Sequence, residues 1–99
     1  MTLTLLPLAE QTIVITGASS GVGLVTAREA ARRGARVVLA ARDAPVLARA
    51  VEEIQHEGGR AIAVPADVSD EAEIERLADR AVAEFGAIDT WVNIATAAA

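Results

Sequence analysis

The chain has 99 residues, of which 53% are hydrophobic, and its formal net charge is −5. This length and apolar content fit one folded domain, which we expect to span residues 1–99, and they argue against a disordered chain. An acidic chain without a basic tract is atypical of proteins that bind nucleic acids. The chain has no cysteine, which excludes disulfides and thiolate metal sites and fits the cytoplasmic location that we expect.

Residues 1–11 are expected to form an N-terminal tail that leads into the first strand. The segment from Met1 to Leu8 is apolar, but it has no basic region, no long apolar region and no cleavage site of a signal peptide. No run approaches the ~18 consecutive apolar residues of a membrane span. We therefore expect no association with a membrane.

Four short β-type runs alternate with three helical stretches in the rest of the chain. The predicted strands are residues 12–16, 35–41, 61–64 and 90–94. The predicted helices are residues 21–33, a helix that starts at Asp43, and a helix capped by Ser69 or Asp70. Glycines end these helices, namely Gly34, Gly58, Gly59 and Gly86.

The second and third helices each have an apolar stripe at helical spacing. The residues expected on their inner faces are Leu47, Ala50, Val51 and Ile54, then Ile74, Leu77, Ala78, Ala81, Val82 and Phe85. The order β-α-β-α-β-α-β with short connections predicts an α/β fold with a parallel sheet and helices on its faces. We expect a Rossmann-like sheet with the strand order 3-2-1-4.

A glycine-rich turn, Thr16-Gly17-Ala18-Ser19-Ser20-Gly21-Val22-Gly23, joins the first strand to the first helix. Gly17 permits a tight turn, Gly21 lets the backbone approach a pyrophosphate, and Gly23 lets the helix pack against the strand. The N–H groups at the start of the helix then face the anion. The turn therefore predicts a nucleotide phosphate site. A P-loop is excluded, because the chain has no lysine.

The spacing T-G-x-x-x-G-x-G in this turn resembles the first turn of the short-chain dehydrogenase/reductase family. Two later segments also resemble that family: Ala66-Asp67-Val68 after the third strand, and Asp89 to Asn93, which is similar to the start of D-x-L-V-N-N-A-G. The resemblance implies that the Asp67 side chain and the Val68 backbone contact an adenine, and that Asn93 closes the sheet beside a ribose. The alternative for Asp67 is a turn that caps the following helix.

The end of the second strand favours NADP over NAD as the cofactor. An acid at this place would bond the ribose 2′-OH and repel a 2′-phosphate, but Ala41 stands there. Arg42 follows, and its guanidinium can bind a 2′-phosphate, to which Ser20 can add a hydroxyl. We interpret Asp43 as the N-cap of the second helix, in preference to an acid shifted by two places. The alternative for Arg42 is a solvated surface arginine.

The resemblance covers about Gln11 to Ala95 and has two departures near its end. Ile94 stands where the family has its second Asn, and Thr96 stands where it has Gly. The catalytic groups of the family, a Ser on the next strand and a Tyr-x-x-x-Lys on the next helix, have no counterpart, since the chain has no tyrosine and no lysine. We therefore expect no catalytic residue here. The cofactor-binding residues that we expect are Gly17, Ser19, Ser20, Gly21, Val22, Gly23, Arg42, Asp67, Val68 and Asn93.

The resemblance thus implies the cofactor-binding half of an NADP-dependent oxidoreductase for alcohols or carbonyl compounds, a truncated doubly wound fold that is inactive alone. A non-catalytic nucleotide-binding module and a truncated gene product remain alternatives. We expect that the strand 90–94 forms an open sheet edge, so that the chain self-associates or needs a partner.

Three further features have ordinary structural interpretations. His56, the only histidine, lies near the end of a helix, where a cation suits the dipole, and we expect no metal site. An acidic cluster fits the first turn of a helix better than a cation site, and its members are Asp67, Asp70, Glu71, Glu73 and Glu75. Trp91 is expected to pack in the core.

Overall fold

The structure, a computed structural model, describes residues 7–94. Its elements in chain order are a 3-10 turn at Leu8–Glu10, β1 (Thr12–Thr16), α1 (Gly21–Arg32), β2 (Arg36–Ala41), α2 (Ala44–His56), β3 (Arg60–Pro65), α3 (Glu71–Phe85) and β4 (Thr90–Asn93). Every predicted strand and helix is present, and their ends differ from the prediction by about one residue.

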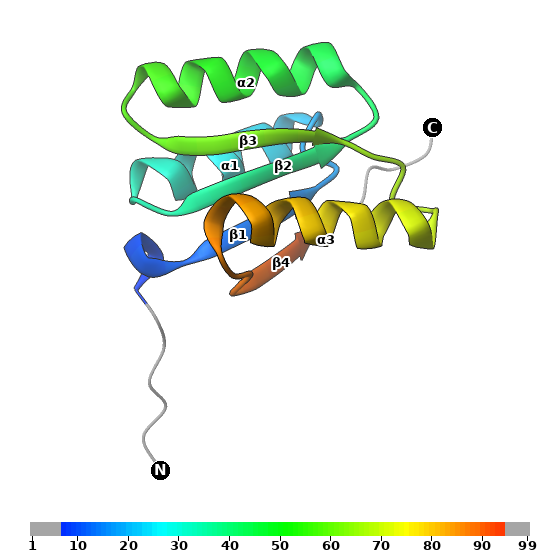
Figure 1. Cartoon of the computed structure of the whole chain (residues 1–99). Helices are drawn as coiled ribbons and strands as arrows, with labels where there is room; N and C mark the ends of the chain where they lie inside the picture. The colour runs from blue at the N-terminus through cyan, green and yellow to red at the C-terminus, as the bar shows by residue number, and fades with distance from the viewer. Residues whose placement is uncertain (1–6, 95–99) are drawn as a thin grey trace.

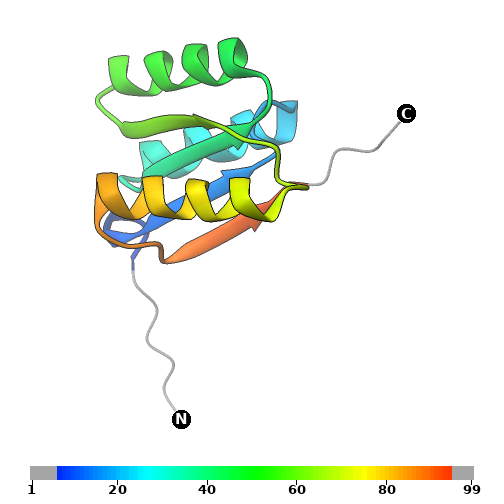
Figure 2. The same ribbon diagram turned by 45° about the vertical axis from the view of Figure 1, so that its right-hand side comes forward.

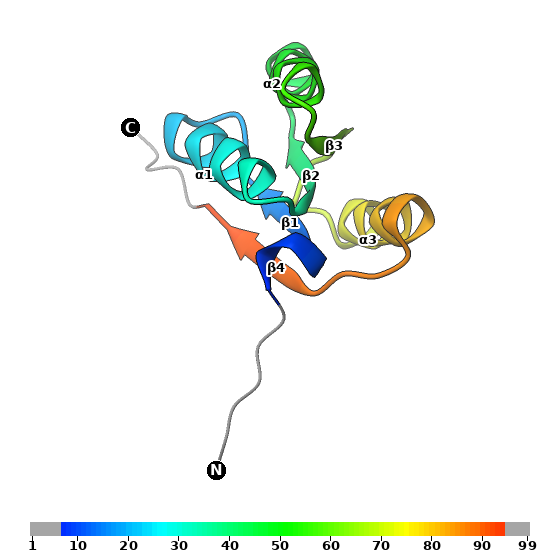
Figure 3. The ribbon, with the colours of Figure 1, turned by 90° about the vertical axis from the view of Figure 1, so that its left-hand side faces the viewer.

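The four strands form one parallel sheet in the order β3-β2-β1-β4, which confirms the predicted fold class (Figure 1). In register, Val14 of β1 lies between Val38 of β2 and Trp91 of β4. Helices α1 and α2 cover one face of the sheet and α3 covers the other (Figure 3). This is the doubly wound arrangement, in which the connections between parallel strands place helices on both faces.

Two apolar layers hold the sheet between its helices. On one face, Ile13 and Ile15 of β1 and Leu39 of β2 pack with Leu47 and other residues of α1 and α2. On the other face, Val14 and Val38 pack with Leu77 and Ala81 of α3. All five residues of β1 are buried, because both faces of a parallel strand are covered.

The predicted tail is partly folded. Leu8–Glu10 forms the 3-10 turn, and the Arg36 guanidinium donates hydrogen bonds to the Glu10 carbonyl (2.8 Å) and to Thr12 Oγ1 (2.9 Å). These bonds attach the end of the expected tail to β1 and β2. The rest of the expected tail, residues 1–6, lies outside the described residues, as do Thr96 and its neighbours 95–99.

The prediction that Val82 lies on the inner face of α3 is wrong, because this residue is 46% exposed. Leu77 and Ala81 form the buried stripe of α3. Val82 follows Ala81 directly, which turns its side chain by about 100° around the helix, away from the sheet.

All four strands point toward the same end of the molecule (Figure 2). The turns that follow β1, β2 and β3 meet at this end. In open α/β sheets, ligands bind at the carboxyl ends of the strands. The fold therefore brings together the predicted glycine turn, Arg42 and Asp67.

Candidate cofactor-binding site

A pocket of about 420 Å³ lies at the carboxyl ends of the strands. Residues from three turns line it: Thr16, Gly17, Ser19, Ala41, Arg42, Asp43, Ala66, Asp67, Val68, Ser69 and Ile94. It thus contains Gly17, Ser19, Arg42, Asp67 and Val68 of the residues predicted to bind a cofactor. Of the others, Ser20, Gly21, Val22 and Gly23 belong to the adjoining turn and the start of α1, and Asn93 lines a neighbouring pocket.

Gly17 and Gly23 are required by the fold of the turn. Gly17 has a φ of +69°, which side chains other than that of glycine rarely adopt. A Cβ on Gly17 would also overlap the carbonyl oxygen of Ile94, directly after β4. A Cβ on Gly23 would lie 2.6 Å from the Gly17 carbonyl oxygen and 2.8 Å from Ala18 Cα. Gly23 therefore allows α1 to pack against the turn that precedes it.

Gly21 differs from these two glycines. It is not among the glycines with positive φ, and a Cβ built on it meets no atom of the described chain within 4 Å. Neither backbone conformation nor packing within residues 7–94 requires a glycine here. Val22, the next residue, is 66% exposed. The start of α1 therefore has open space beside the Gly21 Cα, at the end of the sheet where the pocket lies.

Ser20 is the N-cap of α1. Its hydroxyl accepts a hydrogen bond from the Gly23 N–H (3.0 Å) and donates its hydrogen to the Gly17 carbonyl (3.0 Å). Both bonds stabilise the turn. The expected contact between the Ser20 hydroxyl and a 2′-phosphate stays a prediction. Because the hydroxyl donates its hydrogen to the Gly17 carbonyl, it could donate to a phosphate only after this hydrogen bond breaks.

At the end of β2, Asp43 is the N-cap of α2, as the sequence predicted. Its carboxylate accepts a hydrogen bond from the Val46 N–H (3.3 Å). Arg42 is exposed, and within residues 7–94 it forms no hydrogen bond or ion pair through its side chain. The guanidinium therefore lines the pocket without being held by a hydrogen bond or an ion pair in this part of the chain.

Asp67 lies across the pocket from the end of β2. Its Oδ1 accepts hydrogen bonds from the Ser69 hydroxyl (2.6 Å) and the Ser69 N–H (3.0 Å). These two bonds, and more weakly the charge of Arg42, lower the pKa of the Asp67 carboxyl. Asp67 does not cap α3, since Asp70 is the N-cap and accepts from the Ala72 N–H (2.9 Å).

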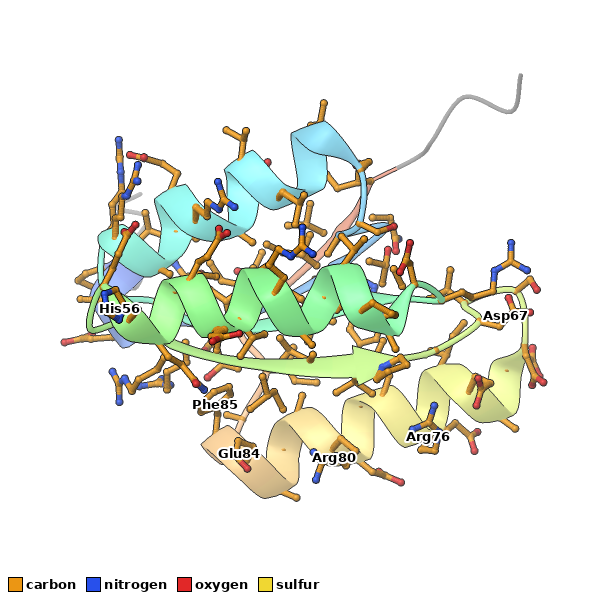
Figure 4. All side chains as sticks on the ribbon, turned by 90° about the horizontal axis from the view of Figure 1, so that it is seen from above. His56, Asp67, Arg76, Arg80, Glu84 and Phe85 are labelled. Carbon is orange, nitrogen blue, oxygen red and sulfur yellow. The ribbon has the colours of Figure 1, made fainter. Side chains whose placement is uncertain are left out.

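The first turns of α3 support the loop that carries Asp67. The Asp67 N–H donates to the Glu73 carboxylate (3.1 Å), and Arg76 donates to the Pro65 carbonyl (2.6 Å) and to Glu73 (3.2 Å). Figure 4 shows Asp67 and Arg76 at this end of α3, with Arg80 further along the helix. The Asp67 N–H and the Arg76 guanidinium lower the pKa of Glu73. Sequence reasoning missed this support, although Ser69 two residues after Asp67 is a recognisable turn signal.

A second pocket of about 450 Å³ adjoins the first at the end of β4 and is lined by Thr16, Val68, Ile74, Trp91, Asn93 and Ile94. The Thr16 hydroxyl donates to Asn93 Oδ1 (2.7 Å), which links β1 to β4. At the start of β4, Asp89 Oδ2 accepts from the Thr12 N–H (2.8 Å). Trp91 packs beside the buried residues under α3, but it is only half-buried and its indole N–H donates to Asn93 Oδ1 (3.1 Å).

His56 lies at the end of α2 remote from Asp67, and so far from the pocket (Figure 4). Within residues 7–94, no group of three or more histidine, aspartate or glutamate side chains is arranged to hold a metal ion. Over the same residues, no helix has the length and apolar character needed to cross a membrane.

Comparisons with known proteins agree with this geometry. The profile of the short chain dehydrogenase family matches residues 11–99. An uncharacterized oxidoreductase, YxnA of Bacillus subtilis (strain 168), is 54% identical over 86 residues, which cover 87% of this chain and 24% of that protein. The chain therefore spans about a quarter of the length of this relative.

Two solved structures resemble the fold and contain different cofactors. A metagenomic short-chain oxidoreductase in complex with NADP is 40% identical, with a TM-score of 0.81 over 89% of this chain and 40% of that chain. A short chain dehydrogenase/reductase from Burkholderia phymatum in complex with NAD is 37% identical, with a TM-score of 0.84 over 88% of this chain and 31% of that chain. The strand order, the glycine turn and the match over residues 11–99 lead to one conclusion: the chain belongs to the short-chain dehydrogenase family.

Proposed function

We propose that this chain is the NADP(H)-binding part of an oxidoreductase that acts on alcohols or carbonyl compounds. The proposal is supported by the pocket at the carboxyl ends of the strands, which combines a basic side chain, a carboxylate and a glycine turn. When bound, the nicotinamide group would supply or accept the hydride. The residues described here would bind and orient the cofactor.

The three turns of the pocket match three parts of NADP. At the start of α1, the Gly21 and Val22 N–H groups have no acceptor within the helix and can bind the pyrophosphate, while Ser20 caps the Gly23 N–H. The Arg42 guanidinium can bind the 2′-phosphate bidentately. Asp67 Oδ1 is engaged by Ser69, so Oδ2 is the oxygen that would accept from the adenine amino group. Val68, 40% exposed, offers its backbone and an apolar surface to the same base.

Gly21 is the observation that carries this proposal. The fold of the described residues accounts for Gly17 and Gly23, whereas nothing in that fold fills the space beside Gly21. A missing side chain at the N-terminus of a helix lets an anion approach the backbone N–H groups. A phosphate of the cofactor therefore explains a glycine that the protein's own packing does not require.

The substitution Gly21→Ala tests the proposal. We expect the unfolding free energy to stay unchanged or to rise by up to about 1 kcal/mol, because alanine is favoured over glycine in a helix. NADP⁺ affinity, measured by calorimetry, should fall at least about tenfold, because the new methyl group occupies the phosphate position.

Gly23→Ala serves as the contrast, since its methyl group would meet the Gly17 carbonyl and must lower the stability. A Gly21→Ala variant that binds NADP⁺ as well as the wild type would contradict the proposed phosphate position. Failure of the wild type to bind either dinucleotide would contradict the proposed function as a whole.

A nucleotide-binding module without catalysis is the second candidate. The 99 residues contain no tyrosine and no lysine, so the proton-transfer dyad of the family cannot be built from them alone. We propose that the 99-residue chain by itself binds cofactor without turnover. Detectable NADPH oxidation with a panel of aldehydes and ketones, after repurification, would contradict this part of the proposal.

A further inference from the structure

Two hydrogen-bond donors meet at one oxygen of Asn93. The Thr16 hydroxyl donates to Oδ1 at 2.7 Å, and the Trp91 indole N–H donates to the same atom at 3.1 Å. These are the hydrogen bonds of this side chain within the described residues. They satisfy the acceptor end of the amide and engage neither hydrogen of Nδ2.

The strand geometry explains why these three residues meet. Thr16 and Asn93 are register partners in β1 and β4, so their side chains lie side by side. Trp91 precedes Asn93 by two residues and points to the same face of the sheet, the face covered by α3. The indole thus lies directly beside the amide, in the wall of the pocket that adjoins the glycine turn.

The indole decides which way the amide is turned. A hydroxyl can donate or accept, so Thr16 alone would fit either orientation of Asn93. An indole N–H can only donate, and it therefore requires the amide oxygen on its own side. The amide nitrogen is then directed away from the donors, and the Asn93 side chain is exposed at the pocket.

We propose that Trp91 is a positioning residue, whose indole N–H fixes the Asn93 amide so that its NH₂ group donates to the cofactor. This inference rests on the proposed NADP(H) site. The corresponding position of the family segment D-x-L-V-N-N-A-G is leucine, which has no donor. Trp91 therefore adds a restraint on Asn93 that a leucine cannot give.

The orientation of the amide can be tested without any ligand. The chain has one tryptophan and one asparagine, so ¹⁵N–¹H spectra contain one indole signal and one asparagine NH₂ pair. We expect Trp91→Leu to shift the Asn93 NH₂ pair and to increase its exchange with solvent. Ile74→Val, which alters the same pocket wall without removing a donor, should leave that pair in place.

The second part of the test is NADP⁺ binding by calorimetry. In the wild type, NADP⁺ should shift the Asn93 NH₂ pair. Trp91→Leu should weaken binding about two- to tenfold, the effect of one net hydrogen bond. Asn93→Asp should weaken it at least as much, because a carboxylate still accepts from Thr16 and Trp91 but has no hydrogen to donate.

Unchanged Asn93 signals in the Trp91→Leu variant would overturn the proposal, and so would shifted signals with unchanged NADP⁺ affinity. Urea unfolding of each variant separates these outcomes from loss of the fold. If the wild type does not bind NADP⁺, the proposed function fails, while the ligand-free spectra still show whether the indole fixes the amide.

Discussion

Arg42 is the residue of the pocket that we propose to distinguish the two nicotinamide dinucleotides. Ala41 precedes it where an acid would favour NAD, and Asp43 is engaged as the cap of α2. Across the pocket, the charge of Arg42 adds a small lowering of the Asp67 pKa to that from the two Ser69 hydrogen bonds. NADP differs from NAD by a 2′-phosphate, which the guanidinium can bind and which a carboxylate at this place would repel.

The substitution Arg42→Ala should therefore remove a preference for NADP⁺ over NAD⁺. A charge-assisted hydrogen bond contributes about 1.5–3 kcal/mol, so the ratio of the two affinities should fall about tenfold or more. Calorimetric titration of both cofactors, with wild type and variant, measures this ratio.

Arg49→Ala is the matched control, because Arg49 is an exposed arginine of α2 that lines a different pocket. It should keep the wild-type ratio while losing the same charge. Equal affinity of the wild type for both cofactors would show that Arg42 is a solvated surface arginine.

At the scale of elements, the junction between β3 and α3 depends on ionised carboxylates. Glu73 accepts from the Asp67 N–H and from Arg76, and Asp67 accepts twice from Ser69. These bonds lower the pKa of both carboxyls in the folded state. Folding therefore favours the ionised forms, and this contribution to stability is complete above the ordinary pKa range of unfolded Asp and Glu, about 3.9 to 4.3.

Acid should consequently loosen this junction. As the pH falls below about 4, through the depressed pKa values of the folded state, the carboxyls bind protons and the contribution is lost. Glu73→Gln keeps an acceptor for the Asp67 N–H but cannot titrate, so its unfolding free energy should fall less steeply between about pH 6 and pH 3 than that of the wild type. Urea unfolding at each pH measures both curves.

Glu75→Gln is the control for this experiment, because Glu75 lies on the same helix without a hydrogen bond to the loop. Glu75 is exposed and Glu73 is only half-buried, so water screens both charges and the difference between the curves should be small. Identical curves for the wild type and the Glu73→Gln variant would show that Glu73 does not stabilise the junction.

At the scale of the whole molecule, β4 forms one edge of the described sheet. Beside it lies an apolar groove of about 460 Å³ between β1, β4 and α1, lined by Ile13, Ile15, Val25 and Val92 among others. Val25 is 67% exposed. An open edge strand beside an apolar groove favours pairing with another chain.

We predict that the 99-residue chain self-associates through this edge and groove. Sedimentation at several concentrations should show a mass that rises with concentration. Val25→Lys places a charge in the groove and should shift association to higher concentration. Val22→Lys is the matched control, since Val22 is equally exposed (66%) on the same helix but does not line the groove. A strictly monomeric wild type would contradict the prediction.

Much of the fold was predictable because its signals are local. The helix ends follow from Gly34, Gly58 and Gly86, which adopt positive φ, and from Asp43 as a cap. Apolar spacing identified Leu47 and Leu77 as buried. Val82 was predicted wrongly because the apolar pattern does not distinguish a residue beside the buried stripe of α3 from a residue within it. Only the position of the helix on the sheet decides which side chain is buried.

The sequence by itself determined the order of strands and helices, the glycine turn and the residue types of the site, since each depends on neighbours within a few positions. Only the tertiary structure decided which residues meet. It placed Arg42 and Asp67 on one pocket, brought the Ile94 carbonyl against Gly17, left the space beside Gly21 open and joined Trp91, Asn93 and Thr16 at one oxygen. These contacts depend on the register and packing of strands far apart in the chain, which local patterns do not encode.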